Sequence, residues 1–295
     1  MTASQDQSPR VALVTGASRG VGAGIARGFG ELGYTVYVTG RSTATGDARG
    51  WDGSVLPGTI AETAAAVTAA GGRGIAVQCD HAEDHQVAAV FELIMKESGR
   101  LDVLVNNAAY IHHQLIEKKP FWEKELDAQY ILDVGLRSAY VASWHAARIM
   151  VPQGSGLIAF TSSFGASCYM HGPAYGAQKA GIDKLAHDME HDLRGSGVVA
   201  VSLWLGPQVT ERSAIAREVN PEQYEAFISM AENPEFSAHI LHAIDHSERR
   251  DKLSGETLIG AEIARELGIT DRGHERPSHR EMLGSPRPKN PAAVY

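Results

Sequence analysis

The stretch Thr15-Gly16-Ala17-Ser18-Arg19-Gly20-Val21-Gly22 follows a short apolar run and precedes an amphipathic segment. Its glycines, at positions 16, 20 and 22, allow a tight turn, a close approach of the backbone to a pyrophosphate, and close packing of a helix on a strand. The N-terminus of that helix would offer free N–H groups and the positive end of its dipole to a phosphate. The stretch therefore predicts a strand, a phosphate-binding turn and a helix, which are the elements of a dinucleotide site.

Seven short apolar runs alternate with longer segments that are compatible with helices. Most of the runs are continuous in Val, Ile and Leu, which is typical of strands that are covered on both faces. We therefore predict an α/β fold, a single-domain, doubly wound (Rossmann-like) parallel sheet of about seven strands with helices on both faces. The runs are Val11–Thr15, Thr35–Thr39, Gly74–Cys79, Leu101–Val105, Leu157–Thr161, Val198–Trp204 and Thr257–Ile259.

One domain is expected at residues 10–272, because no long linker or internal repeat interrupts this alternation. Residues 1–9 are polar and are predicted to be a disordered N-terminal segment. Residues 273–295 contain Gly, Pro and Arg throughout and carry no core signal. We expect them to form a tail that is partly disordered or packed across a neighbour.

Three long segments depart from the rhythm of strands and helices: Ser42–Gly58, Tyr110–Pro120 and Gly206–Glu235. The first is rich in Gly, Ser and Thr and is predicted to be a long loop after the second strand. Ligands bind in this architecture at the carboxyl ends of parallel strands. The other two segments are therefore the expected walls of a substrate site.

The composition excludes several classes of partner. The 295 residues include 27 Lys and Arg against 35 Asp and Glu, so the formal charge is −8, which argues against a nucleic-acid partner. No uncharged apolar stretch reaches the roughly 18 residues of a transmembrane helix, so no membrane partner is expected either. Cys79 and Cys168 form no CxxC motif, which fits a reducing compartment. Because the first residues contain no apolar leader, we expect a cytoplasmic protein.

Three ordered motifs resemble the short-chain dehydrogenase/reductase family: the TGxxxGxG turn, Asn106-Asn107-Ala108-Ala109, and Tyr175-Gly-Ala-Gln-Lys179. The likeness runs from Arg10 to Thr210. The resemblance implies an NAD(P)-dependent oxidoreductase with a small-molecule carbonyl or alcohol substrate, and a homodimer or homotetramer built on the fifth and sixth helices of the family fold. Four further stretches resemble the dehydrogenase/reductase member 1 subgroup and extend the likeness to Gly273: Asp133–Arg137, Ala147–Pro152, Val201–Trp204 and Leu253–Glu256.

The end of the second strand reads Thr39-Gly40-Arg41, without the acidic residue that would bind a ribose hydroxyl and repel a 2′-phosphate. Arg41 and Arg19 could together hold a 2′-phosphate through charge-assisted hydrogen bonds. This favours NADP(H), with NAD(H) possible. The alternative interpretation is two solvated surface arginines.

Other cofactor contacts follow from the resemblance. It places Asp80 at the adenine edge and Asn106, Asn107 and Ala108 along the adenosine ribose, although small buried polar residues could serve purely structural ends there. It places Gly206 and Thr210 at the carboxamide end of the nicotinamide. Leu205-Gly206-Pro207 departs from the family's usual Pro-Gly at this point.

Tyr175 and Lys179 are four residues apart on a helix predicted at Pro173–Arg194, so their side chains project from one stripe. A phenol has a pKa of about 10, and a nearby ammonium together with an oxidised nicotinamide would lower it. Tyr175 could then give a proton to a carbonyl oxygen or take one from an alcohol. By resemblance, Lys179 also binds the nicotinamide ribose.

A serine from the end of the fifth strand should orient the substrate oxygen as a hydrogen-bond donor. Alignment of the strand favours Ser163, whereas the usual spacing to Tyr175 would select Ser162. Where the family's proton relay usually has an Asn, this chain has Gly135, which keeps the backbone carbonyl and permits a kink.

Two further groups of residues have the type or spacing of functional sites. His187-Asp-Met-Glu190-His191 matches a metallopeptidase pattern, but its histidines are predicted to point away from the apolar side of their helix, so we expect no metal. His112-His113, Phe121-Trp122 and Trp204 lie near predicted loop edges or strand ends. The aromatic residues could line an apolar substrate pocket, with core packing as the alternative for Phe121 and Trp204.

The function that follows is an NADPH-preferring oxidoreductase acting on a hydrophobic ketone, aldehyde or secondary alcohol, with Ser163, Tyr175 and Lys179 as its catalytic residues. The alternative is a catalytically weak NADP(H)-binding sensor or scaffold protein, motivated by Gly135 and Leu205.

Overall fold

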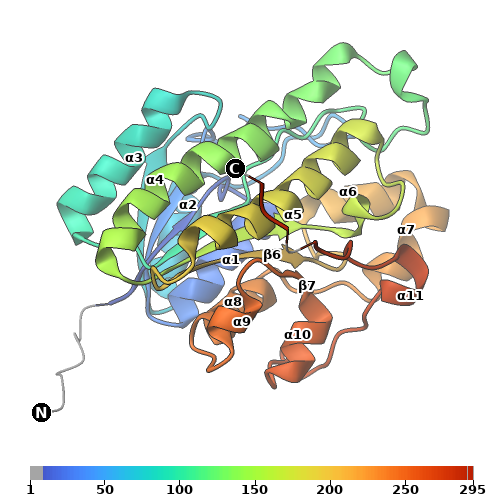
Figure 1. Cartoon of the computed structure of the whole chain (residues 1–295). Helices are drawn as coiled ribbons and strands as arrows, with labels where there is room; N and C mark the ends of the chain where they lie inside the picture. The colour runs from blue at the N-terminus through green and yellow to red at the C-terminus, as the bar shows by residue number, and fades with distance from the viewer. Residues whose placement is uncertain (1–8, 291, 295) are drawn as a thin grey trace, which may run out of the picture.

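The computed structural model describes residues 9–290 and 292–294. Its seven strands form one parallel sheet in the order β3-β2-β1-β4-β5-β6-β7, which confirms the predicted doubly wound fold (Figure 1). The order reverses between β1 and β4, where this architecture opens a crevice at the carboxyl ends of the strands. The strands are β1 Val11–Val14, β2 Thr35–Gly40, β3 Arg73–Gln78, β4 Val103–Asn106, β5 Gly156–Ser162, β6 Val198–Trp204 and β7 Thr257–Ile259.

Helices cover both faces of the sheet (Figure 1). The α-helices are α1 Gly20–Glu31, α2 Ile60–Ala69, α3 Asp84–Ser98, α4 Ser138–Gln153, α5 Pro173–Leu193, α6 Glu211–Val219, α7 Pro221–Ile228, α8 Glu235–Asp245, α9 Arg250–Leu253, α10 Gly260–Glu266 and α11 Arg280–Leu283. Short 3₁₀ turns lie at η1 Phe121–Glu123, η2 Leu126–Ile131 and η4 Phe164–Ala166, and a π-helical turn, η3, lies at Asp133–Arg137.

Alternate strand residues build two separate cores, because successive side chains of a strand point to opposite faces. Ala12 and Val14 of β1 pack with α1, α2, α8 and α10, whereas Val11 and Leu13 pack with α3, α4 and α5. All seven residues of β5 and all seven of β6 are buried, which explains why these runs are continuously apolar. The central strands are therefore rigid supports for whatever follows their carboxyl ends.

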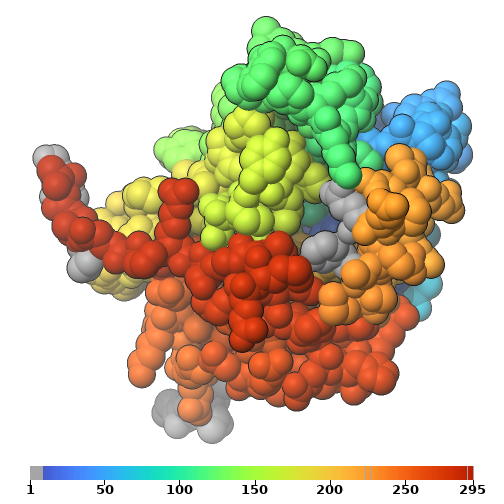
Figure 2. Space-filling view, turned by 90° about the vertical axis from the view of Figure 1, so that its right-hand side faces the viewer, coloured from blue at the N-terminus to red at the C-terminus, as the bar shows by residue number. Residues whose placement is uncertain are grey.

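The three long segments all follow carboxyl ends of strands, as predicted. Residues 42–58 form a loop, while residues 110–131 are loop with two 3₁₀ turns. The segment after β6 contains two helices, α6 and α7, that were not distinguished in the sequence. Figure 2 shows the face on which the green chain after β4, the yellow-green start of α5 and the orange α6–α7 region stand around a hollow.

The segment after Arg272 packs against its own chain, which its composition did not indicate. His279 is buried, and Leu283 of α11 packs against a small apolar cluster of Phe164, Trp204 and Ile259. Arg280 forms an ion pair with Glu262 of α10. The expected disordered segment at residues 1–9 falls, except for Pro9, outside the described residues. Within the described part of the chain, no helix has the length and apolar character to cross a membrane.

Candidate active site

An open cleft of about 1590 Å³ runs along the carboxyl ends of the strands. Nearly all the residues predicted for the site line it, although they come from seven parts of the chain. They are Gly16, Ser18, Arg19, Gly20, Val21, Gly22, Arg41, Asp80, Asn107, Ala108, Ser163, Tyr175, Lys179, Gly206 and Thr210. One predicted residue, Asn106, is not among the lining residues.

Asn106 is turned away from the cleft. It is the last residue of β4, it is buried, and its Nδ2 donates a hydrogen bond to Ser143 Oγ of α4 at 3.0 Å. Because strand side chains alternate, Asn107 points the opposite way, into the cleft. The Asn106 side chain therefore does not face the cleft, which favours the structural alternative, while the predicted contact of this segment with the adenosine ribose stays a prediction.

The glycine turn leaves room for a phosphate group at the start of α1. Gly16 and Gly20 have φ angles of 63° and 56°, which favour glycine. A Cβ on Gly16 would lie 2.6 Å from Ala108 Cα, and the Asn107 amide donates to the carbonyls of Thr15 and Gly16 at 2.9 and 3.1 Å. The first turn of α1 has no acidic residue and no side-chain cap, so its N–H groups stay available. These features fit a dinucleotide pyrophosphate.

The two arginines predicted to hold a 2′-phosphate both line the cleft but differ in their surroundings. Arg19 donates from Nε to the carbonyl of Pro57 at 3.0 Å and from Nη2 to that of Gly58 at 2.6 Å, and burial lowers its pKa. Arg41 is 69 % exposed and lies 3.8 Å from Asp80. Arg19 therefore ties the loop at residues 42–58 to the glycine turn, whereas Arg41 is mostly exposed and pairs, among the described residues, only with the Asp80 carboxylate of the same cleft.

Ser163, Tyr175 and Lys179 converge where β5 ends beside the first turns of α5. Ser163 follows the last residue of β5 and caps η4, and its Oγ lies 2.9 Å from the Tyr175 hydroxyl. Lys179 Nζ donates to the Thr161 carbonyl at 3.0 Å and lies 5.5 Å from the centre of the Tyr175 ring. Ser162 also lines the cleft, but its Oγ donates to the Lys179 carbonyl at 3.4 Å. The geometry thus favours Ser163 over Ser162 as the partner of Tyr175.

Burial is the main influence on the pKa values of Tyr175 and Lys179 in this structure. It raises the pKa of the Tyr175 phenol, opposed by the hydrogen bond with Ser163, and it lowers the pKa of Lys179 to about 8, opposed by the charge of Asp183. Desolvation is the largest cause, because a buried phenolate loses its hydration, and the Ser163 hydrogen bond, rather than the Lys179 charge, is what opposes it in this structure. The acidification of the phenol by Lys179 together with an oxidised nicotinamide stays a prediction.

Asp183 lies one helical turn beyond Lys179 on α5 and is held by the neighbouring strand. Its Oδ1 accepts from Ser202 Oγ at 2.6 Å, and its Oδ2 accepts from Trp204 Nε1 at 2.9 Å. Burial raises its pKa, which these hydrogen bonds oppose. Trp204 is fully buried, so its core packing is confirmed, whereas Phe121 is 62 % exposed and core packing was wrong for it.

The nicotinamide end predicted for the cleft is tied together by a buried carboxylate that sequence reasoning missed. Glu232 Oε2 accepts from the Gly206 N–H at 3.2 Å and from Gln208 Nε2 at 2.6 Å. Burial raises the pKa of Glu232 to about 7. Thr210 accepts from the N–H of Ser213 and caps α6. Nothing in the sequence alone placed residue 232 against residue 206, because their pairing depends on the path of α6 and α7.

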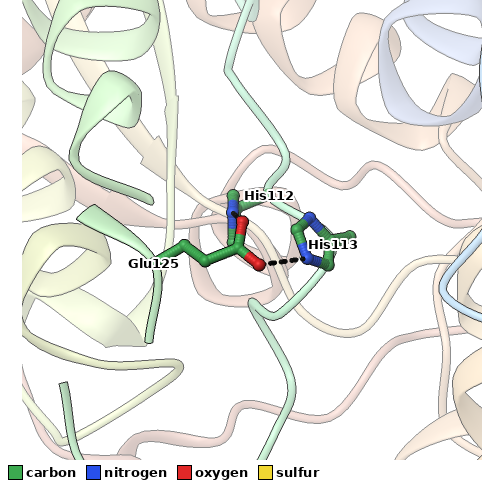
Figure 3. Close-up of side chains that lie close together, drawn as sticks. All are labelled: His112, His113 and Glu125. Carbon is green, nitrogen blue, oxygen red and sulfur yellow. Dashed lines mark ion pairs between the residues drawn. The ribbon is translucent and has the colours of Figure 1, made fainter. Parts of the chain in front are cut away.

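The metallopeptidase-like pattern on α5 does not assemble a ligand set among the described residues. Glu190 forms an ion pair with Arg194 instead. Within the described chain, the one group of potential metal ligands lies elsewhere, at His112, His113 and Glu125, with the two residue pairs His112–Glu125 and His113–Glu125 at 3.6 and 3.3 Å (Figure 3).

His112 is engaged in other contacts at that group. Its Nδ1 accepts a hydrogen bond from the Gln114 N–H at 3.1 Å, so the neutral ring carries its proton on Nε2, which faces the Asp127 carboxylate at 2.8 Å. A protonated Nε2 cannot ligate a metal. His112 therefore serves to fix the 110–131 segment, and its carbonyl accepts from Trp51 Nε1 at 3.3 Å.

Comparisons with known proteins agree with this geometry. Residues 10–223 match the family model described as short chain dehydrogenase. The Mus musculus protein named dehydrogenase/reductase SDR family member 1 is 39 % identical over 274 residues, covering 89 % of this chain and 83 % of that protein. The Homo sapiens protein of the same name is 38 % identical over the same shares. The chain belongs to the short-chain dehydrogenase family of oxidoreductases, and the closer resemblance to the member 1 proteins is confirmed.

Solved structures share the fold. A provisionally assigned dehydrogenase from Xanthomonas campestris has a TM-score of 0.75 and 25 % identity, covering 90 % of this chain and 93 % of that one. A Beutenbergia cavernae structure, provisionally assigned as an NAD(P)-dependent gluconate 5-dehydrogenase, has a TM-score of 0.70 and 27 % identity, covering 86 % and 96 %. That structure has NADP bound at low occupancy.

Proposed function

We propose that the protein is an NADPH-preferring oxidoreductase that interconverts a hydrophobic ketone or aldehyde with its alcohol. The observation that carries this proposal is the contact of 2.9 Å between Ser163 Oγ and the Tyr175 hydroxyl, at a cleft that also contains the glycine turn and Lys179. A hydroxyl pair on a rigid strand end and a helix, beside a dinucleotide cradle, is suited to proton transfer at a substrate oxygen.

In this proposal a nicotinamide cofactor, when bound, supplies or accepts the hydride. Tyr175 donates its proton to the carbonyl oxygen during reduction and receives one from the alcohol during oxidation. Ser163 donates a hydrogen bond to the same oxygen and stabilises its developing charge. Lys179 would bind the ribose, and its positive charge would favour the phenolate over the buried phenol when the site is complete.

The preference for NADPH rests on Arg41, which has 69 % of its side chain exposed at the end of β2, and on the absence of an acid at that strand end. The NADP in the Beutenbergia cavernae structure is consistent with this preference. The hydrophobic substrate class rests on Tyr110, Ile111 and Ile131, which line the same cleft as Tyr175.

The testing experiment measures NADPH and NADH oxidation with a panel of ketones and aldehydes, in wild type and Tyr175→Phe. We expect wild type to turn over hydrophobic carbonyls and Tyr175→Phe to lose about 10²–10⁴-fold in kcat, because general acid catalysis contributes that much. Tyr169→Phe is the matched control, since Tyr169 is 81 % exposed. Equal activity in wild type and Tyr175→Phe would remove Tyr175 from the mechanism. Tight NADPH binding with no turnover would instead favour the sensor or scaffold alternative.

A homodimer or homotetramer is also proposed, built on α4 and α5, which in this chain stand in the place of the fifth and sixth helices of the family fold. Tyr140, Trp144 and Val151 of α4 are 53 %, 49 % and 43 % exposed, and their spacing places them along one side of the helix. An exposed apolar stripe of this kind suits a second copy of the chain. Sedimentation of wild type and Trp144→Asp tests this, with a shift toward monomer expected for the variant. An unchanged sedimentation coefficient would place the interface elsewhere.

A further inference from the structure

Arg212 is a charged residue of the cleft that belongs to none of the sequence motifs and has no role in the proposed function. It lies in the first turn of α6, is half-buried and lines the cleft. Within the described part of the chain, its guanidinium forms no hydrogen bond and no ion pair. Burial lowers the pKa of Arg212, the charge of Arg19 lowers it further, and Glu211 opposes both. Arg212 therefore carries a partly desolvated charge that no acidic side chain of the described chain contacts.

The Trp51 ring lies beside this guanidinium. Arg212 Cζ is 5.5 Å from the centre of the ring, which is within the range of a cation–π contact, and an indole gives the strongest contact of this kind. Trp51 is itself held, because its Nε1 donates to the His112 carbonyl at 3.3 Å. A cation–π contact places the guanidinium without an oxygen acceptor, so its N–H donors can still bind an anion.

The 42–58 loop spans the distance from the glycine turn to α6. A Cβ on Gly58 would lie 2.5 Å from the Ser18 carbonyl oxygen, so the end of the loop packs against the glycine turn. A Cβ on Gly50 would lie 2.6 Å from Cδ1 of Ile215, so the middle of the loop packs against α6. The loop therefore holds its tryptophan against α6 on one side of the cleft and its own end against the phosphate cradle on the other.

The start of α6 faces the start of α1, where the phosphate cradle lies. A Cβ on Gly20, the first residue of α1, would lie 3.7 Å from Thr210 Cγ2 and 4.0 Å from Glu211 Oε2. The cradle offers backbone N–H groups, but its own cation, Arg19, already donates to two carbonyls of the 42–58 loop. Because both phosphates of a pyrophosphate are negatively charged, a cation on the α6 side would complement the N–H groups on the α1 side.

We propose that Arg212 binds the pyrophosphate of the nicotinamide cofactor from the α6 side of the cleft, with the Trp51 ring of the 42–58 loop as its support. The inference rests on the proposed function, because it needs a dinucleotide in the cleft. The guanidinium donates to phosphate oxygens, which offsets its partial desolvation and its repulsion with Arg19. Since NADPH and NADH share the pyrophosphate, Arg212 should serve both cofactors, whereas Arg41 should serve NADPH.

The test measures cofactor binding by isothermal titration calorimetry, without substrate, in wild type, Arg212→Gln and Arg217→Gln. Arg217 is the matched control, because it lies on the same helix, is not among the residues that line the cleft, and pairs with Glu225 at the surface at 2.6 Å. Arg212→Gln should weaken the binding of NADPH and of NADH by the same factor, about tenfold or more, because a charge-assisted contact is lost. Arg217→Gln should leave both affinities within about twofold.

Fragments of the cofactor locate the contact. ADP-ribose contains the pyrophosphate and no 2′-phosphate, whereas 2′-AMP contains a 2′-phosphate and no pyrophosphate. In competition with NADPH, ADP-ribose should bind Arg212→Gln about tenfold or more weakly than wild type, and 2′-AMP should bind both proteins equally. A loss confined to NADPH and 2′-AMP would place Arg212 at the 2′-phosphate and overturn the proposal. Unchanged binding of both dinucleotides would overturn it as well.

Trypsin cleavage separates phosphate binding from mere packing of the loop. Arg49 is exposed in the 42–58 loop and is therefore open to trypsin. NADPH should slow cleavage after Arg49 in wild type, because a bound pyrophosphate fixes Arg212 and hence Trp51. At equal occupancy by NADPH, this protection should be about threefold or more smaller in Arg212→Gln. If Arg212 only packs against Trp51, cleavage of the variant is faster without NADPH and equally protected with it, and that result would contradict the proposal.

Arg212→Lys is the milder substitution, and thermal unfolding of each variant verifies that it is folded. Lysine keeps the charge but loses the planar fork, so it should recover part of the affinity for both dinucleotides. If Arg212→Lys binds no better than Arg212→Gln, the charge is not what binds the cofactor, and the role of Arg212 is wrong. If wild type itself binds neither NADPH nor NADH, it is the proposed function that fails.

Discussion

Two regions of the cleft are held in different ways. One is the β5–α5 edge, formed by the end of β5 and the start of α5. The other consists of three surrounding segments: residues 42–58, residues 110–131 and the α6–α7 region. Ser163 and Lys179 are fixed by a strand that is buried along its whole length and by main-chain acceptors such as Thr161. The surrounding segments instead rest on one another. Trp51 of the 42–58 loop donates to His112 of the 110–131 segment, and Arg212 of α6 lies 5.5 Å from the Trp51 ring.

This difference separates the tasks that the two regions can perform. A group that transfers a proton must be placed within a few tenths of an ångström, which packed strands and helices achieve. Segments that contact mainly each other can change in sequence without disturbing the sheet, so they are suited to define the substrate. Substitutions at the β5–α5 edge should therefore reduce kcat, and substitutions in the surrounding segments should change ligand affinity or protein stability.

The largest effect is expected from the two serines at the end of β5. Ser163→Ala should lower kcat about 10²–10³-fold, because it removes the hydrogen-bond donor nearest Tyr175. Ser162→Ala should lower kcat only a few-fold, since the Ser162 hydroxyl contacts the Lys179 carbonyl and Asp183 rather than Tyr175. Steady-state kinetics of both variants with one carbonyl substrate measures this.

Thermal unfolding of the same two proteins is the control, because Ser163 also caps η4 by accepting from the Gly165 N–H at 3.2 Å. A lost cap lowers the unfolding temperature but not kcat in the folded fraction. If Ser162→Ala proves the more damaging of the two, the interpretation of the β5 edge must be reversed.

An effect of intermediate size on cofactor binding is expected at Arg41, which lies between the end of β2 and the loop at residues 42–58. Arg41→Ala should raise the KM for NADPH about tenfold or more and leave the KM for NADH nearly unchanged, because hydrogen bonds to a charged group contribute about 1.5–3 kcal/mol. Arg49→Ala is the control, since Arg49 is exposed in the same loop and does not line the cleft. Equal effects on the KM values of the two cofactors would contradict the proposal that Arg41 binds the 2′-phosphate.

The features that could be predicted from the sequence are those set by local physical rules. Continuous apolar runs identified the seven strands, and the glycine turn identified the first crossover, because backbone sterics and burial act within a few residues. Strand alternation also predicts that Asn106 and Asn107 point to opposite sides of the sheet, but this prediction requires the exact residue at which the strand ends.

What could not be predicted depends on contacts between distant segments. The contact of Trp51 with His112, and the 26-residue separation of Gly206 and Glu232, leave no local signal. Phe121 illustrates the same limit, since its apolar character suggested burial and its segment instead holds it in solvent.

The smallest effect is expected from Glu232, which lies in the surrounding region. Its pKa is raised from 4.5 to about 7, first by burial, with Asp271 adding to the shift and Gln208, Gly206 and Arg276 opposing it. Because the folded state binds this proton more tightly than the unfolded chain, the stabilisation is complete below about pH 4.5 and is lost as pH rises through 7. Wild type should therefore lose unfolding temperature between pH 5 and pH 8, and Glu232→Gln, which cannot ionise, should lose less.

Differential scanning fluorimetry across this pH range measures the difference, and Glu218→Gln is the control because Glu218 is an exposed acid on α6. The comparison of regions becomes sharper if kcat is measured at the same pH values. Glu232 ties Gly206 to Gln208, so its ionisation should alter the stability of that segment and the KM for the cofactor. The pH dependence of kcat should instead be set by the titratable groups around Tyr175. If Glu232→Gln instead moved the pH profile of kcat, the surrounding segments and the β5–α5 edge would be one coupled unit, and the division of tasks between them would be wrong.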